Sequence, residues 1–210
     1  MWRENDGGGP QMSDTAQGRK CRVGLVFGGR SGEHDVSIVS ARSVDGALNR
    51  QKYDVLPMAI DRDGLWSDAD TACRVLDESG DRTDGVQQFA GCHTLDPRLL
   101  EGAVDVAFPV LHGPYGEDGT IQGLFDMLDL PYVGCDAASS ALCMDKIFCK
   151  RQLAHAGLRT PEWIELDHRS WSEARDDVIE RCIALGPPLF VKPARLGSSV
   201  GITKVATESD

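Results

Sequence analysis

The stretch Cys21-Arg-Val-Gly-Leu-Val-Phe27, followed at once by Gly28-Gly29, decides the fold of this chain. It is a short apolar run that breaks into a tight turn, which is typical of a buried first strand. A helix is expected next, ending near Asn49-Arg50, because apolar side chains recur at helical spacing. The stripe expected to pack on the sheet consists of Val36, Val39, Ser43 or Val44, and Ala47 or Leu48.

Outward from this stretch, strand and helix patterns alternate. They are a strand Tyr53–Ile60 closed by the turn Asp61–Gly64, a strand Val104–Leu111, a helix Thr120–Asp129 and a short strand Pro131–Gly134. Such alternation predicts an α/β fold with a Rossmann-like, doubly wound parallel sheet. We place the end of this first unit near Cys135.

A second unit has a different order of elements. We expect a helix Ser139–Ala156 stopped by Gly157, a strand Thr160–Leu166, a helix Ser172–Leu185, and strands Leu189–Lys192 and Val200–Val205. The predicted division is a disordered leader over residues 1–20, a first domain over 21–137, and the first part of an α+β domain over 138–210.

The composition favours a soluble globular protein, with 41% hydrophobic and 26% charged residues and a net charge of −11. A phosphate backbone would favour the opposite charge, and no apolar run has the length of a membrane span. We therefore expect no nucleic-acid or membrane partner and a cytoplasmic location. The seven cysteines include no C-x-x-C pair, so we expect most to be small buried side chains.

Two polar loops follow predicted strands. The first, Gly28-Gly-Arg-Ser-Gly-Glu33, places Glu33 where a ligand ammonium can pair with it. The second, Leu111-His-Gly-Pro-Tyr-Gly-Glu-Asp-Gly119, places His112 where it can orient a carboxylate or phosphate. For each loop the alternative is a plain turn, with Glu33 complementing the helix dipole.

Two further segments carry lysines. Lys146 lies in a predicted helix, where a lone lysine is most often only a solvated residue. Lys192 ends a strand and precedes a loop of small residues that includes Gly197, Ser198 and Ser199. Backbone N–H groups and hydroxyls of such a loop can hold phosphate oxygens beside a lysine. It lacks the Walker A order of residues, and a simple hairpin is the alternative.

These four segments, in this order, resemble the D-alanine–D-alanine ligase family of the ATP-grasp superfamily, over nearly everything from Arg22 to Val205. The resemblance implies that ATP phosphorylates one D-alanine and that the amine of a second attacks the acyl phosphate. It implies that Glu33 anchors the first substrate's ammonium, that Val36 contacts its methyl group and that His112 lies beside the reacting carboxylate. Ser198 would link Glu33 to the catalytic hydrogen bonds.

Lys146 and Lys192, with Gly197, Ser198 and Ser199, would by the same resemblance hold the ATP phosphates. Leu196 departs from the family, which often has an acidic residue there. The family's Mg2+ or Mn2+ ligands and catalytic arginine are expected beyond Asp210, so we expect a truncated chain that does not complete catalysis alone. Family members are usually homodimers.

Two other readings stay open. The second substrate of such a ligase can be D-lactate or D-serine, and the residues that select it belong mainly beyond Asp210. The other is a non-catalytic nucleotide- or peptide-binding module on a Rossmann-like domain. Against that module, Gly28-Gly-Arg-Ser-Gly32 lacks the G-x-G-x-x-G fingerprint of dinucleotide binding.

Overall fold

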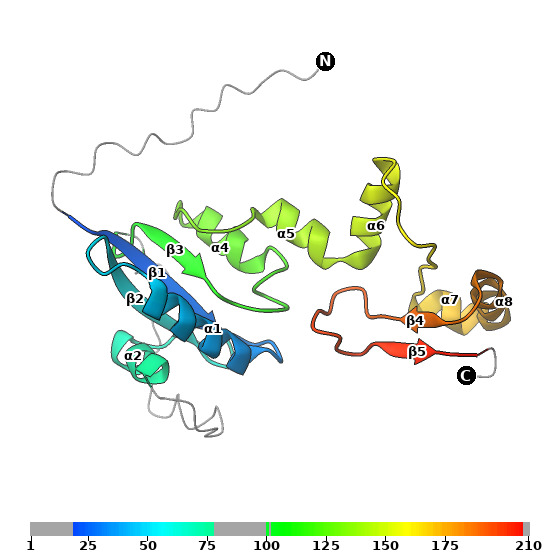
Figure 1. The fold of residues 1–210 in the computed structure, drawn as a ribbon, viewed down its shortest axis with the longest axis horizontal. Helices are drawn as coiled ribbons and strands as arrows, with labels where there is room; N and C mark the ends of the chain where they lie inside the picture. Colours follow the sequence, from blue (N-terminus) through cyan, green and yellow to red (C-terminus); the bar gives the residue numbers. More distant parts are fainter. Residues whose placement is uncertain (1–18, 78–99, 101, 208–210) are drawn as a thin grey trace, which may run out of the picture.

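A computed structural model describes residues 19–77, 100 and 102–207 of the protein. Most of the predicted leader, 1–18, lies outside the described residues. The elements are β1 (Cys21–Gly28), α1 (His34–Ala47), β2 (Tyr53–Ile60), α2 (Ala69–Asp77), β3 (Val106–Pro109), α4 (Thr120–Met127), α5 (Ala137–Met144), α6 (Lys146–His155), α7 (His168–Glu173), α8 (Arg175–Leu185), β4 (Leu189–Val191) and β5 (Thr203–Val205). Figure 1 shows one part built around β1, β2 and β3, and a second built around β4 and β5, with α5 and α6 between them.

The first part is the predicted α/β sheet. Its order is β2-β1-β3, and β1 pairs in parallel with both neighbours. The expected strand at Pro131–Gly134 is reduced to one parallel bridge between Tyr132 and Ala107. The third strand is also shorter than predicted, because regular pairing with β1 ends at Pro109.

Both faces of this sheet are covered, as a doubly wound fold requires. Leu25 and Phe27 of β1 pack with α1 and α2, whereas Val26 between them packs on the other face with α4. This alternation follows from the two-residue period of a strand. The apolar run from Val23 is therefore buried on both sides, which explains why it contains no charged residue.

The predicted apolar stripe of α1 is wrong in its register. Val36 and Val39 are 54% and 59% exposed, whereas the buried positions are His34, Ser37, Ile38 and Ala41. Of the predicted set, Val44 does pack against the core. The helix is rotated because Ser37 forms hydrogen bonds with the ends of two strands, so a polar side chain occupies a position that a purely apolar pattern assigns to the surface.

The helix predicted over Ser139–Ala156 is two helices. Asp145 interrupts it with an extended backbone, and its side chain accepts hydrogen bonds from the N–H groups of Ile147 and Phe148. It is thus the N-cap of α6, and Lys146 becomes that helix's first residue rather than a mid-helix one. Gly157 follows α6 with a φ of +73°, as its predicted stop role requires.

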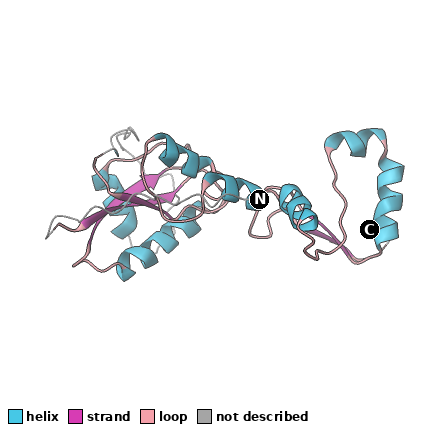
Figure 2. Cartoon of the chain, turned by 90° about the horizontal axis from the view of Figure 1, so that it is seen from above, coloured by secondary structure: helices cyan, strands magenta, loops and turns pink. Residues whose placement is uncertain are grey.

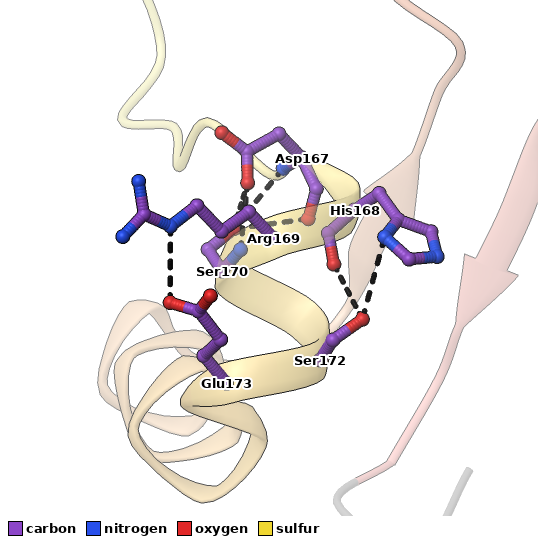
Figure 3. A network of polar contacts seen from close by, with 6 residues as sticks. All are labelled: Asp167, His168, Arg169, Ser170, Ser172 and Glu173. Carbon is purple, nitrogen blue, oxygen red and sulfur yellow. Dashed lines mark hydrogen bonds and ion pairs between the residues drawn. The ribbon is translucent and has the colours of Figure 1, made fainter.

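The next segments differ more from expectation. Residues 158–167, all within the described chain, form no strand, so the strand Thr160–Leu166 is wrong. The helix predicted from Ser172 is instead α7 and α8, and Figure 3 shows the network that starts α7. There Asp167 accepts from the Ser170 N–H, and Ser170 Oγ accepts from the Asp167 N–H, a reciprocal cap.

The predicted pair of C-terminal strands is confirmed as the antiparallel hairpin β4–β5, in the register Leu189↔Val205. Viewed from above, the chain is elongated, with the three-stranded sheet in one part and the hairpin with its helices in the other (Figure 2). Of the helices in the described segments, none is long and apolar enough to cross a bilayer.

Candidate active site

The candidate site lies at the carboxyl edge of the three-stranded sheet. There the chain leaves β1 for α1 on one face and leaves β3 for α4 on the other, which is the position where such sheets bind ligands. Gly28 and Gly29 make the first turn with φ values of +88° and +91°. A side chain on Gly28 would lie 2.3 Å from the Ile60 carbonyl oxygen, so this turn requires glycine.

Serine hydroxyls tie the two loops together. Ser37 Oγ accepts from the Gly28 N–H at 2.8 Å and donates to the Val110 carbonyl at 2.6 Å. Ser31 Oγ accepts from the Glu33 N–H at 3.1 Å and donates to the His112 carbonyl at 2.6 Å. The predicted residues Glu33 and His112 are therefore held next to each other by Ser31, which the motif analysis did not single out.

Glu33 occupies the N-cap position of α1, but within the described chain its side chain makes no capping hydrogen bond. Instead its Oε1 accepts a hydrogen bond from Ser198 Oγ. A side chain on Gly113 would lie 2.6 Å from Glu33 Oε2, so Gly113 leaves room for the carboxylate. The alternative in which Glu33 only complements the helix dipole does not explain this pairing with Ser198.

His112 is half-buried and faces α1. Its Nε2 lies 3.0 Å from Ser40 Oγ, with the donor set by the ring tautomer. The following Gly113 N–H donates to Glu117 Oε2 at 2.8 Å and fixes the loop. Ser40 was also missed from sequence; the available signal is its place one turn after Val36 on the same helix.

The loop between β4 and β5 brings Ser198 to Glu33 across 165 residues of chain. Ser198 and Ser199 have φ values of +48° and +60°, a region that non-glycine residues rarely occupy. The Val200 N–H donates to the Gly197 carbonyl at 3.0 Å and closes the turn. In Figure 1 this loop projects toward the end of the sheet where α1 begins, in agreement with the hydrogen bond between Ser198 and Glu33.

Lys146 meets the same loop from the start of α6. Its N–H donates to the Ala194 carbonyl at 3.0 Å, and its Nζ donates to the Leu196 carbonyl at 2.5 Å. Beside it, Asp145 Oδ2 accepts from Arg195 Nε at 2.8 Å. The Arg195 guanidinium, with the Ile147 and Phe148 N–H groups, holds the pKa of the Asp145 carboxyl below its usual range.

The structure connects some of the predicted site residues by hydrogen bonds and leaves others apart. Hydrogen bonds link Glu33 directly with Ser198, and link Glu33 with His112 through Ser31. Lys146 contacts the loop between β4 and β5, called the Ser198 loop below, at Leu196. Lys192 is exposed at the end of β4, with its Nζ 5.8 Å from the centre of the Phe190 ring. None of the hydrogen bonds in the described segments joins the side chain of Lys192 to the other candidates, and the apolar side chain of Val36 is 54% exposed.

Metal ligands were expected outside these residues. Over the described ranges, no group of three or more His, Cys, Asp and Glu side chains is arranged to hold a metal ion. The six cysteines in these ranges are free thiols, and three of them are exposed, contrary to the expectation that most are buried.

Comparison with models of known protein families shows to which family the chain belongs. A family model described as "D-ala D-ala ligase N-terminus" matches residues 22–135, and one described as "D-ala D-ala ligase C-terminus" matches residues 152–210. The chain belongs to the D-alanine–D-alanine ligase family. The first match includes Glu33 and His112 and the second includes Lys192 and Ser198, whereas Lys146 lies between the two matched ranges.

Individual members of the D-alanine–D-alanine ligase family agree with this assignment. The chain is 43% identical to the enzyme named D-alanine–D-alanine ligase from Streptomyces avermitilis, over 89% of this chain and 54% of that protein. Identity to the enzyme of the same name from a Thermoanaerobacter species is 42%, over 91% of this chain and 55% of that protein. The chain spans about half the length of the curated relatives it matches.

Solved structures of the family share the fold. The VanG D-Ala:D-Ser ligase from Enterococcus faecalis superposes with a TM-score of 0.72 at 35% identity, over 90% of this chain and 56% of that one. The D-alanine–D-alanine ligase from Coxiella burnetii gives a TM-score of 0.72 at 32% identity, over the same shares of the two chains. The expected combination of a Rossmann-like sheet and the beginning of an ATP-grasp domain is therefore confirmed.

Proposed function

We propose that this chain carries the first-substrate site and part of the ATP site of a ligase that joins two D-alanines. The observation that carries the proposal is the hydrogen bond from Ser198 to Glu33. It brings a glycine- and serine-rich loop, suited to phosphate oxygens, against a carboxylate suited to an ammonium group.

In the proposed reaction, a carboxylate oxygen of the first D-alanine attacks the γ-phosphorus of ATP and ADP leaves. The amine of the second D-alanine then attacks the acyl phosphate, loses a proton and expels phosphate as the peptide bond forms. Such phosphoryl transfer depends on fixed cations and N–H donors rather than on a protein nucleophile. Lys146 and Lys192 would supply the charges, and Gly197, Ser198 and Ser199 the loop around the phosphates.

The neighbouring side chains would orient the first substrate. His112, held at its Nε2 by Ser40, would lie beside the reacting carboxylate, and the exposed Val36 would contact the methyl group. Mg2+ or Mn2+ is proposed to accompany ATP, but no step is assigned to the metal because the described side chains offer no cluster for it. By resemblance to the family, the protein is also proposed to be a cytoplasmic homodimer.

A D-serine acceptor is the second candidate, because one of the superposed structures is a D-Ala:D-Ser ligase. Both functions share the first-substrate site at Glu33. They differ in the product, D-alanyl-D-alanine or D-alanyl-D-serine, which mass spectrometry distinguishes.

Calorimetric titration of the 210-residue chain tests the proposal directly. ATP and D-alanine should each bind, and NAD should not. Because we expect no complete turnover from this chain alone, phosphate release and product mass with D-alanine alone and with added D-serine or D-lactate are measured on a version completed at its C-terminus. Failure of the chain to bind either ATP or D-alanine would overturn the assignment, whereas binding of NAD would support the dinucleotide module instead.

A further inference from the structure

The segment that joins Lys192 to Ser198 is fastened to the start of α6. The N–H and Nζ of Lys146 donate to two of its carbonyls, and Arg195 donates to Asp145. The end of the same loop carries Ser198, which reaches Glu33. One short loop is thus held from two sides, by α6 and by the loop after β1.

The two carboxylate oxygens of Asp145 accept hydrogen bonds from different groups. Oδ1 accepts from the N–H groups of Ile147 and Phe148, which caps α6, whereas Oδ2 accepts from Arg195. The side chain of Asp145 is only 9% exposed, while that of Arg195 is 74% exposed. The Asp145 carboxylate is therefore held in place at the start of α6, and the exposed Arg195 side chain of the loop binds to it.

The backbone of the loop needs such an anchor. Ser198 and Ser199 both hold left-handed φ values, which persist only where the surrounding contacts determine them. Arg195 lies three residues before Ser198, so loss of its ion pair would release the strained turn on the side that faces α6. The loop would then keep only the backbone-carbonyl contacts to Lys146 on the α6 side and the contact of Ser198 with Glu33 on the other.

We propose that the Asp145–Arg195 ion pair is a positioning device that sets the Ser198 loop between Glu33 and Lys146, so that the amino-acid and phosphate sites form together. This inference rests on the proposed function. Neither residue touches substrate; each acts through the loop. The Arg151–Glu165 surface pair also involves α6, but in the described residues the hydrogen bonds of Arg151 go to Glu165 and not to the Ser198 loop.

The pair of variants Asp145→Asn and Arg195→Met isolates this role. Asparagine is as good an N-cap as aspartate, so Asp145→Asn keeps α6 capped through its amide oxygen, while it removes the charge opposite Arg195 and puts an NH2 donor in place of the accepting Oδ2. Arg195→Lys retains a positive charge and should rescue. Arg151→Met is the matched control, because it removes an arginine of α6 that pairs outside the site.

Titrations with ATP and with D-alanine supply a readout that a structural role would not move. Asp145→Asn and Arg195→Met should each weaken both ligands by about tenfold. By contrast, Glu33→Gln should weaken mainly D-alanine, and Lys192→Ala mainly ATP. Arg195→Lys should stay within about threefold of the wild-type chain and Arg151→Met within about twofold on the same scale.

The outcomes separate the inference from the function beneath it. If the wild-type chain binds both ligands and Asp145→Asn and Arg195→Met bind them equally well, the positioning role is wrong and the proposed function stands. If the wild-type chain fails to bind ATP, D-alanine or both, the proposed function fails, and hydrogen exchange over residues 193–202 decides the inference. Faster exchange in both variants than in Arg151→Met supports it, and unchanged exchange overturns it.

Discussion

Single carboxylates and hydroxyls at the sheet edge have distinct tasks. Glu33 is placed at a helix N-terminus yet is directed away from the helix, toward Ser198. Ser37, one helical turn later, is fully buried and joins the end of β1 to the segment after β3. The first side chain is placed for a ligand, and the second keeps the two loops in register, so their substitutions should have different signatures.

Glu33→Gln tests the ligand role. Glutamine keeps the size and a hydrogen-bond acceptor for Ser198 but removes the charge opposite a substrate ammonium. D-alanine affinity should fall by about tenfold or more, with ATP affinity nearly unchanged. The control is Asp35→Asn, which removes an exposed carboxylate two residues away that pairs with Arg62. Equal losses in both variants, measured by calorimetry, would show that only net charge matters.

Ser37→Ala tests the structural role. It leaves the buried Gly28 N–H and the Val110 carbonyl without their shared partner, so the free energy of unfolding should fall by about 1–3 kcal/mol. Urea unfolding followed by circular dichroism measures it. Ser43→Ala is the matched control on the same helix, because Ser43 is exposed and donates only to the Val39 carbonyl. If the control costs as much, helix propensity rather than the bridge explains the loss.

Among the elements, β1 is fixed at both ends by polar contacts. At its carboxyl end, Ser37 and the Gly28–Gly29 turn hold the site. At its amino end, Asp105, just before β3, accepts from the backbone N–H and the guanidinium of Arg22 at 2.8 Å. The side-chain hydrogen bonds from Arg22, supported by Arg19, hold the pKa of the Asp105 carboxyl far below its usual range. The ionised form therefore stabilises the pairing of β1 with β3.

Asp105→Asn should lower the free energy of unfolding by about 1–3 kcal/mol at neutral pH. Because the folded-state pKa is depressed, this stabilisation is present above the unfolded-state pKa near 3.8 and is lost as pH falls toward the folded-state pKa. The difference between wild type and variant should therefore shrink below about pH 4 in urea titrations. Asp54→Asn, which breaks the exposed Lys20–Asp54 pair, should show little effect at any pH.

Sequence patterns predicted the helices and strands that are marked by a regular pattern of apolar residues. The strand Tyr53–Ile60 was predicted with its observed bounds, because the apolar run from Val55 to Ile60 is typical of a parallel strand and the turn after Ile60 marks its end. The helix break at Asp145 was missed because a cap depends on one side chain rather than on periodicity. Residues 160–166 looked like a strand from their composition, but strand formation depends on a pairing partner, which no local pattern reveals.

The candidate site was predicted in the same uneven way. Glu33 and Ser198 were predicted from the motifs and are joined in the structure. Ser31, which contacts Glu33 and His112, Ser40, which contacts His112, and Arg195, which contacts Asp145, were missed because serines in turns and exposed arginines are common without any such role. Their contributions depend on contacts between segments distant in sequence, and these contacts exist only once the chain has folded.

At the scale of the whole molecule, the two parts differ in how much they bury. Every buried hydrophobic residue in the described ranges except Val178 lies between Val23 and Leu130. In the second part, two apolar residues of β4 are largely exposed, Phe190 at 56% and Val191 at 50%. A region with few buried apolar contacts opens locally at low free-energy cost, whereas the core of a sheet opens only with global unfolding.

Hydrogen exchange followed by mass spectrometry should therefore show two levels of protection. Peptides covering β1 should exchange at least about 100-fold more slowly than peptides covering β4 and β5, after correction for intrinsic rates. ATP should narrow the gap, because a ligand held by Lys146 and the Ser198 loop stabilises the hairpin as well as the site. Equal protection of the two parts without ligand would mean that the hairpin is as stable as the sheet. In that case the hydrogen bond from Ser198 to Glu33 would join two rigid bodies, and ATP would have no loop left to order.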